Sequence, residues 1–317
     1  MGFFDFLNGT LAIEAGSSCL RIIKDGDIVY NEPTAISFNP NDNRVSGVGN
    51  SINSTPPNKI IEPFNYVISD FVGFESCLRG AIKKIDNQVS LFPKSYKMFF
   101  SIPIGTTEIE KRAFRDSAEH AGAKEVCMIH SPYCTALELN LLKEVRDFLI
   151  VDFSKSKFEV TMFCNSIPVS EGTLRLGTQQ IENLVKNHIY RSFNILPAED
   201  EVRLLLSSTF SNQNHVMLQH KEVELLKVEE LIDHYLTFVI DELFTCIDTV
   251  KNSSKNEALG RGIYFTGGGA KYENICQLIA KRLNLVSNLS ANPLHDNVNG
   301  LSKIMANPKG FEEFLMN

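Results

Sequence analysis

Three short turns in this chain carry residue types that can bind phosphate. Each follows an apolar segment; the three are Ile13–Ser18 (IEAGSS), Val151–Lys157 (VDFSKSK) and Phe265–Ala270 (FTGGGA). Glycine and small hydroxyl residues let backbone N–H groups approach a phosphate without interference from Cβ, and a helix N-terminus adds positive potential. Glu14 and Asp152 end the first two apolar segments and could hold a hydrated divalent cation between phosphates. A single strand–glycine–helix junction is more often structural, so it is the ordered set of three that favours a nucleotide site.

The elements that must position these turns occur twice. Residues 11–30 predict strand, tight turn, strand, a turn at Asp25–Gly26, and strand. Residues 147–169 predict the same layout, with a turn at Asn165–Ser166. Such self-similarity predicts a duplicated α/β unit with one copy in each half of the chain.

The remaining pattern alternates helices with short strands. Helical periodicity and end signals predict helices at 70–86, 107–122, 132–142, 179–191, 198–206, 228–250 and 273–283. Further strands are expected at 96–103, 126–129 and 262–266. We expect a loop up to about Asn58, and a polar strip lies at 207–220.

Composition limits the classes of protein to consider. The chain has 317 residues, 43% hydrophobic and 22% charged, with a formal net charge of −7. This composition excludes global disorder, and the length predicts at least two domains. The acidic balance argues against nucleic acid as the main partner, since phosphate neutralisation needs a basic face. Seven cysteines without a Cys-x-x-Cys pair fit a reducing cytosol better than a disulfide framework or a zinc site. No apolar run approaches the ~18–20 residues of a spanning helix, and the first residues lack the basic segment of a secretory signal.

The amino-acid sequence of several segments resembles the actin superfamily of ATPases and, within it, the bacterial MreB family of rod-shape-determining cytoskeletal proteins. The matching segments run in order along nearly the whole chain: Ile28–Thr34, Phe100–Ala113, Ser117–Val126, Arg175–Gly177, Gly262–Ala270 and Asn292–Leu294. The resemblance implies an α/β actin-like fold, in which two RNase H-like domains flank a nucleotide cleft and each carries a smaller subdomain. On this basis domain I comprises residues 1–142 plus 292–317, with its small subdomain at about 31–66. Domain II comprises 143–291, with a shortened small subdomain at about 179–235.

The resemblance also implies ATP with Mg²⁺ as cofactor, but the phosphate end departs from the family pattern. The family's first-loop Asp-Leu-Gly-Thr corresponds to residues 14–17, so Glu14 is the metal-site acid, and Gly16, Ser17 and Ser18 form the loop. The family's second loop, Asp-x-Gly-Gly-Gly-Thr-Thr, corresponds to residues 152–158. Asp152 is retained there as the second metal-site acid, while all three glycines are replaced. Bulky side chains therefore stand where backbone amides should meet phosphates.

The family's catalytic glutamate corresponds to Ser131, which cannot serve as a general base near neutral pH, so we assign no catalytic residue. His130 is a weak candidate to substitute, and a packed or surface histidine is the alternative. The adenosine end is better matched. The implied contacts there are Gly267, Gly268 and Gly269, the charge-preserving pair Asp200 and Arg203, and Gly177. The family's Gly-Gly-Asp corresponds to residues 177–179, so its acid is replaced by Gln179.

Lys155 and Lys157 leave two interpretations open. One ammonium could replace the divalent cation as the counter-charge of a phosphate. The alternative, which we favour from sequence, is that both are solvated charges on an exposed hairpin.

Two apolar features predict contact with a membrane surface. Phe3, Phe4, Phe6 and Leu7 crowd the N-terminus, and Leu91 and Phe92 resemble the family's paired insertion loop; packing on their own domain is the alternative. The C-terminal Gly310–Asn317 is expected to pack as a cap rather than to dock elsewhere.

We therefore expect an MreB-like scaffold for cell shape and wall morphogenesis, with a degenerate nucleotide site and weak or no ATPase activity. Its expected partners are itself in a filament, the inner membrane surface and cell-wall elongation proteins, and its expected location is cytoplasmic, peripheral at that membrane. The alternatives are an active ATP-hydrolysing filament protein and a non-polymerising regulator of a true MreB.

Overall fold

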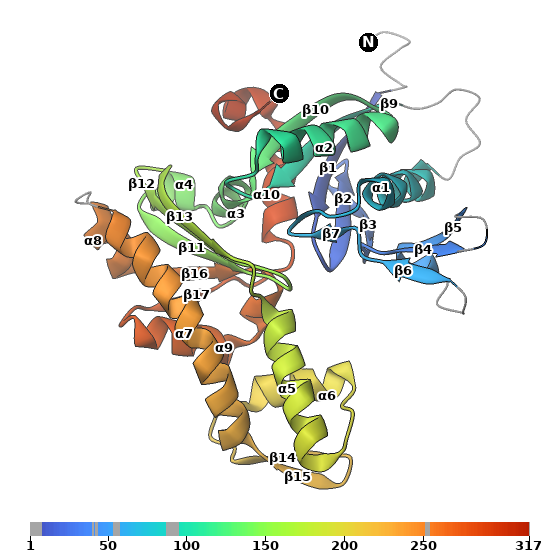
Figure 1. Ribbon diagram of the computed structural model, residues 1–317. Helices are drawn as coiled ribbons and strands as arrows, with labels where there is room; N and C mark the ends of the chain where they lie inside the picture. Colours follow the sequence, from blue (N-terminus) through green and yellow to red (C-terminus); the bar gives the residue numbers. More distant parts are fainter. Residues whose placement is uncertain are drawn as a thin grey trace. The chain divides into compact units, whose positions relative to one another are not determined.

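The computed structural model describes residues 8–39, 41, 44–52, 58–86, 95–250 and 254–316. The chain divides into two compact units (Figure 1). Unit 1 comprises Met1–Glu138 with Asn297–Asn317, and unit 2 comprises Leu139–Asp296. The domain and subdomain boundaries expected from the sequence stay a prediction.

Unit 1 is built on a mixed five-stranded sheet of order β10-β9-β1-β2-β3. Its strands are β1 (Asn8–Ala15), β2 (Cys19–Lys24), β3 (Asp27–Pro33), β9 (Ser95–Ile102) and β10 (Ala123–His130). β1, β2 and β3 form an antiparallel meander, whereas β9 and β10 add in parallel beside β1. The helices and helical turns of this unit are α1 (Phe71–Asp86), α2 (Glu108–His120), α3 (Ser131–Glu138), most of α10 (Asp296–Ala306), η2 (Gly49–Ser51) and η4 (Pro308–Phe314).

Unit 2 repeats this topology. Written from the opposite edge of the sheet, its strand order is β13-β12-β11-β16-β17. Its strands are β11 (Phe148–Phe153), β12 (Phe158–Cys164), β13 (Ile167–Leu174), β16 (Ile263–Thr266) and β17 (Ser287–Leu289). Again three strands form an antiparallel meander and two more add in parallel beside the first. The helices and helical turns of this unit are α4 (Leu141–Glu144), α5 (Thr178–Phe193), α6 (Glu199–Ser208), α7 (Leu225–Thr249), α8 (Ser254–Arg261), η3 (Gly268–Lys271) and α9 (Glu273–Arg282).

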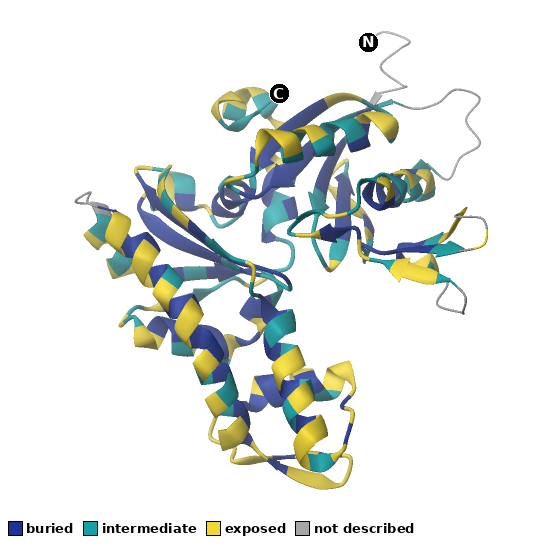
Figure 2. Ribbon diagram, in the orientation of Figure 1, coloured by how far each residue is buried: buried dark blue, intermediate teal, exposed yellow. Residues whose placement is uncertain are grey.

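The identical strand order confirms the duplication predicted from the sequence. The turns between the second and third strands also correspond, because Asp25–Gly26 and Asn165–Ser166 all adopt positive φ. Positive φ at both central residues is the requirement of the type I′ two-residue hairpin turn. Each sheet has its own apolar core; in Figure 2 the strands of both sheets are largely buried, while α7 alternates buried and exposed residues.

Several predicted elements need correction. The region before Asn58 is not a continuous loop, since β4 (Ile36–Asn39), β5 (Arg44–Val48) and β6 (Lys59–Ile61) form a small antiparallel sheet. The polar stretch before α7 contains a hairpin of β14 (His215–Leu218) and β15 (Lys221–Glu224), whose alternate residues Val216, Leu218 and Val223 are buried. Two-stranded β7 (Phe64–Asn65) and β8 (Val67–Ile68), and helices α8 and α10, were not predicted. The helix expected at 132–142 is interrupted at Asn140, which adopts the left-handed conformation.

The C-terminal segment packs on unit 1, as predicted. Met316 pairs with Met128 of β10 through two backbone hydrogen bonds of 2.8 and 2.9 Å. Phe314 stacks on Tyr133 with ring centroids 4.4 Å apart. Since β10 is an edge strand, these contacts cover part of its exposed backbone.

Candidate functional site

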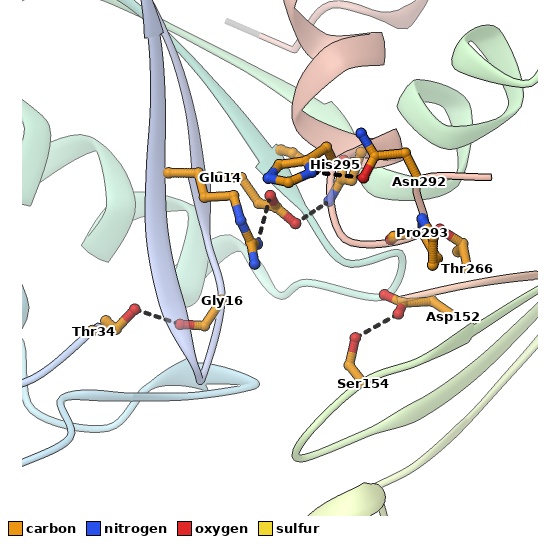
Figure 3. Close-up of polar contacts among 12 residues, drawn as sticks. Glu14, Gly16, Thr34, Asp152, Ser154, Thr266, Asn292, Pro293 and His295 are labelled. Atoms are coloured by element: carbon orange, nitrogen blue, oxygen red, sulfur yellow. Dashed lines mark hydrogen bonds and ion pairs between the residues drawn. The ribbon is translucent and has the colours of Figure 1, made fainter. Parts of the chain in front are cut away.

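The first turn, between β1 and β2, is held by its own backbone. The N–H of Gly16 donates to the carbonyl of Cys19 at 3.0 Å, and the Thr34 hydroxyl donates to the carbonyl of Gly16 at 2.6 Å (Figure 3). The N–H of Thr34 donates to the carbonyl of Ser18 at 3.2 Å. Thr34 is buried, so the end of β3 fixes this turn. The Gly16 amide, one of the groups predicted to meet phosphate, is therefore engaged within the turn.

Glu14, the next-to-last residue of β1, lies beside a buried cation. Its cross-strand partner in β2 is Arg21, and the guanidinium lies 3.1 Å from the Glu14 carboxylate. Both side chains are largely buried. Asn297, at the start of α10, donates to the other carboxylate oxygen at 3.3 Å and accepts from Ser101 at 2.6 Å. The carboxylate of Glu14 is thus neutralised within unit 1.

At the second turn, between β11 and β12, the acid of the first strand is also paired with a cation, but this cation comes from the turn itself. Lys157 Nζ lies 3.2 Å from Asp152 Oδ2 and also bonds Glu159, which is the cross-strand partner of Asp152. The Ser154 hydroxyl donates to the other oxygen of Asp152 (Figure 3). Burial alone would lower the pKa of Lys157, but the attraction of Glu159 and Asp152 outweighs burial and raises it above its usual range.

The favoured prediction that both lysines are solvated is therefore wrong for Lys157, of which only 9% is exposed. The physical reason lies at the two ends of the turn. Phe153 and Phe158 are fully buried and contact each other edge-on, so the turn between them is drawn onto the core. Lys155 lies partly exposed on the same turn.

Gly177 fixes this turn against the N-terminus of α5. The N–H groups of Thr178 and Gln179 donate to the carbonyls of Ser154 and Lys155 at 3.0 and 3.1 Å. A Cβ at Gly177 would lie 2.4 Å from both carbonyl oxygens, which is too close for any other residue. Gly177 therefore has a packing role whatever its contact with a nucleotide.

The third turn follows β16 and contains two crowded glycines and one open glycine. Gly267 has φ +80°, and a Cβ there would lie 2.2 Å from the Asp152 carboxylate. A Cβ at Gly269 would lie 2.4 Å from the Phe153 ring, whereas one at Gly268 would meet only Leu294 at 3.5 Å. Of the three predicted glycines, Gly268 is thus the one at which a Cβ would meet no close contact.

We predict that Gly267→Ala and Gly268→Ala separate these roles. Gly267→Ala should lower the free energy of unfolding by at least about 1–2 kcal/mol, because an L-residue is strained at positive φ and its Cβ collides with Asp152. Gly268→Ala should change it by less than about 0.5 kcal/mol. Urea unfolding followed by circular dichroism measures both. Equal losses in the two variants would show that the crowding at Gly267 does not determine its identity.

A buried hydroxyl–carboxylate group lies beneath the third turn. Asp296, only 2% exposed, accepts from the Thr266 and Ser290 hydroxyls at 2.7 Å each. The N–H of Gly267 donates to the carbonyl of Pro293 at 3.0 Å, which joins the turn to the segment before α10. Figure 3 shows Thr266, at the end of β16, and Pro293, in the segment before α10. These contacts hold the backbone of the turn in place.

The charges expected near the adenosine lie on α6 of unit 2. Asp200 and Arg203 are exposed and form an ion pair of 3.1 Å, with Glu199 as a second partner of Arg203 at 3.4 Å. Asn274 of α9 donates to the carbonyl of Leu206 at 2.9 Å, so it ties the end of α6 to the helix that follows the third turn. Unit 2 thus collects Asp152, Lys155, Lys157, Gly177 and Gly267–Gly269 around adjoining turns, with Asp200 and Arg203 on a helix joined to them.

Ser131 begins α3, directly after β10. Its Oγ is buried and has no hydrogen-bond partner among the described residues. His130 precedes it, half-buried, with Nδ1 3.2 Å from the carbonyl oxygen of Pro103. Because that oxygen can only accept, Nδ1 carries the proton in the neutral ring. Burial lowers the pKa of His130, a hydrogen bond to Pro103 opposes this, and Lys111 adds to the lowering. The geometry is that of a packed histidine.

We predict a pH effect on stability from His130. A histidine whose pKa is lowered on folding contributes stability above its unfolded pKa, about 6.5, and this contribution is lost as the pH falls through the folded value. The free energy of unfolding should therefore fall between pH 7.5 and 5, and it should fall less in His130→Gln. Urea midpoints at both pH values check this, with exposed His234→Gln as the control. An equal fall in His130→Gln and wild type would contradict it.

Comparison with known proteins decides the family. The family model for MreB/Mbl protein matches residues 8–313. The cell shape-determining protein MreB of Escherichia coli strain K12 is 24% identical, over 92% of each chain, and Mbl of Bacillus subtilis strain 168 is 22% identical, over 90% of this chain and 92% of Mbl. This chain belongs to the MreB/Mbl family.

Solved structures of related proteins agree with the fold. The crystal structure of Spiroplasma citri MreB5 bound to AMPPNP matches with a TM-score of 0.84 at 16% identity, over 96% of this chain and 98% of MreB5. The MamK double helical filament matches with a TM-score of 0.76 at 13% identity, over 94% of this chain and 99% of MamK. The predicted actin-like α/β fold is confirmed.

The magnesium expected from the family does not fit the two retained acids. Each acid already has a cation of its own unit: Arg21 for Glu14 and Lys157 for Asp152. Within the described part of the chain, no three His, Cys, Asp or Glu side chains gather as metal ligands. The family's metal chemistry therefore has no counterpart in the contacts of these acids.

The predicted membrane residues, and the residues that the sequence did not single out, remain to be placed. The membrane residues Phe3, Phe4, Phe6, Leu7, Leu91 and Phe92 lie outside the described residues. Sequence reasoning missed Arg21, Glu159, Thr34, Asn274 and Asp296. Of these, Glu159 could have been found, since it follows Lys157 by two residues and so shares its face of an extended chain.

Proposed function

We propose that this protein is a filament-forming cytoskeletal scaffold for cell shape and cell-wall morphogenesis, with little or no ATPase activity. The observation that carries the proposal is the family match along residues 8–313, together with relatives named as cell shape-determining proteins. The MamK filament, which has the same fold, supports self-assembly. The absence of a base at Ser131 supports the lack of hydrolysis.

We propose an adenine nucleotide as the ligand of the turns in unit 2. The MreB5 structures that share this fold are bound to AMPPNP and to ADP. In this chain the open position at Gly268 offers room beside a backbone turn, and exposed Asp200 and Arg203 offer polar contacts. Hydrolysis is not needed for such a ligand to favour one conformation of a subunit.

We propose that filaments attach to the inner membrane surface through Phe3, Phe4, Phe6, Leu7, Leu91 and Phe92. Among the described residues, no helix is both long and apolar enough to cross a bilayer. Two short apolar insertions bind weakly alone, and polymerisation multiplies their affinity by avidity. Cell-wall elongation proteins are the partners that such a scaffold would organise.

Sedimentation with and without lipid vesicles tests the scaffold proposal. Purified protein with AMPPNP should pellet above a critical concentration, and anionic vesicles should increase the pelleted fraction. Phe4→Ser/Phe92→Ser should remove the effect of vesicles and leave polymerisation unchanged. A protein that stays in the supernatant at every concentration, with or without vesicles, would instead support a non-polymerising regulator.

A further inference from the structure

We propose that Lys157 is a built-in counter-ion that replaces the divalent cation, so that nucleotide binding by this protein is independent of magnesium. The inference rests on the proposed nucleotide binding and specifies its chemistry: the ligand is a metal-free nucleoside di- or triphosphate.

The first observation is the position of the ammonium group. Lys157 Nζ lies 3.2 Å from Asp152 Oδ2 and bonds Glu159 as well. A magnesium ion needs oxygen ligands at about 2.0–2.1 Å in octahedral order, either directly or through its waters. A positive ammonium already seated on the carboxylate repels such an ion and occupies the oxygen that would hold it.

The second observation is that the ammonium cannot easily leave. The carbonyls of Ser154 and Lys155 accept from the first N–H groups of α5, and the N–H of Ser154 donates to the carbonyl of Lys157 at 2.9 Å. The turn is thus held at both ends by its backbone, and Lys157 leaves it from a fixed position. Moving the side chain away would leave Asp152 and Glu159 side by side without a cation.

The third observation is that the corresponding acid of unit 1 also has a cation of its own, here on the neighbouring strand. Arg21 lies 3.1 Å from Glu14, its cross-strand partner, and only 8% of Arg21 is exposed. A guanidinium stays charged at any working pH. In each half of the duplicated fold, the acid next to the end of the first strand is therefore balanced by a cation of the chain itself. Because Lys157 balances Asp152, phosphate oxygens that approach this turn do not meet a bare carboxylate, and no metal is needed to bridge the two.

The test measures the affinity for a fluorescent ATP analogue with magnesium and with EDTA. Wild type should show dissociation constants that agree within about twofold in the two buffers, and Mn²⁺ alone should give no bound-ion signal in electron paramagnetic resonance. An affinity that falls tenfold or more in EDTA overturns the inference while the proposed nucleotide binding stands. No binding in either buffer overturns the proposed binding and the inference together.

A charge-matched variant sharpens the test without leaving two acids unpaired. Lys157→Met/Glu159→Gln removes one positive and one negative charge, so Asp152 remains as a single carboxylate. Its affinity in EDTA should fall at least tenfold, and magnesium should restore part of the loss. Glu75→Gln/Arg79→Met, which removes a surface ion pair of 3.2 Å on α1, should behave as wild type. Unchanged, metal-independent affinity in the Lys157 variant would overturn the inference.

Discussion

Purified protein incubated with ATP and magnesium is expected to release phosphate about 10²–10⁴-fold more slowly than an MreB-family protein with glutamate at the Ser131 position. Hydrolysis requires a base to accept a proton from the attacking water. The Ser131 hydroxyl has far too low a basicity, and the structure buries its Oγ without a partner among the described residues. A coupled phosphate-release assay measures the rate directly.

Replacing the base alone should not restore hydrolysis. Ser131→Glu restores a carboxylate at this position. Lys157 is still paired with Asp152, however, and the carbonyls of the second turn still accept hydrogen bonds from the first N–H groups of α5. We therefore expect Ser131→Glu to remain within about tenfold of wild type. Rapid, magnesium-dependent turnover by wild type that is lost in Asp152→Asn would contradict the whole account of a degenerate site.

The sequence was sufficient for the architecture because its signals were local and repeated. The helix predicted at 107–122 begins as expected near Thr107, where Thr107 and Glu110 form a capping box with bonds of 2.7 and 3.3 Å. The Asp25–Gly26 and Asn165–Ser166 turns predicted the two hairpins for the same reason. Weak, short strands such as β14 were missed because four residues with polar neighbours carry too little periodicity.

The state of the site depended on contacts that local patterns do not encode. A lysine in a turn can point to solvent or to the core, and residues 154–157 fit either. The structure decides through Gly177, which is distant in sequence and lets α5 approach the turn. The pairing of Glu14 with Arg21 likewise needed the register of β1 and β2, which the residues of the turn alone do not determine.

Together these contacts change what a ligand can do to the molecule. In a site where a metal bridges protein and phosphates, loss of phosphate or metal removes a contact that favours one conformation. Here each acid keeps its cation within its own unit, so ligand loss leaves those ion pairs intact. For the filament proposed above, we therefore expect assembly that depends little on nucleotide turnover.

The second large effect expected is on stability: Lys157→Met should lower the free energy of unfolding by about 3–5 kcal/mol. The loss comes from leaving the carboxylates of Asp152 and Glu159 without their cation in a buried site. Met fills a similar volume, so a cavity contributes little. Urea unfolding at pH 7.5 measures the change.

The charge-matched Lys157→Met/Glu159→Gln should recover most of this loss, because only one carboxylate then lacks a cation. Arg203→Met is the matched surface control, since Arg203 also pairs with two acids but lies exposed; it should cost no more than about 1 kcal/mol. A raised lysine pKa adds stability that is fully present below the unfolded pKa, about 10.4, and is lost as the pH rises through the folded value. Both pH 7.5 and pH 9 lie below that unfolded pKa. The difference in the free energy of unfolding between wild type and Lys157→Met should therefore not change between them through ionisation of the lysine. A loss no larger than that of Arg203→Met would mean that Lys157 is not the buried counter-charge of these acids.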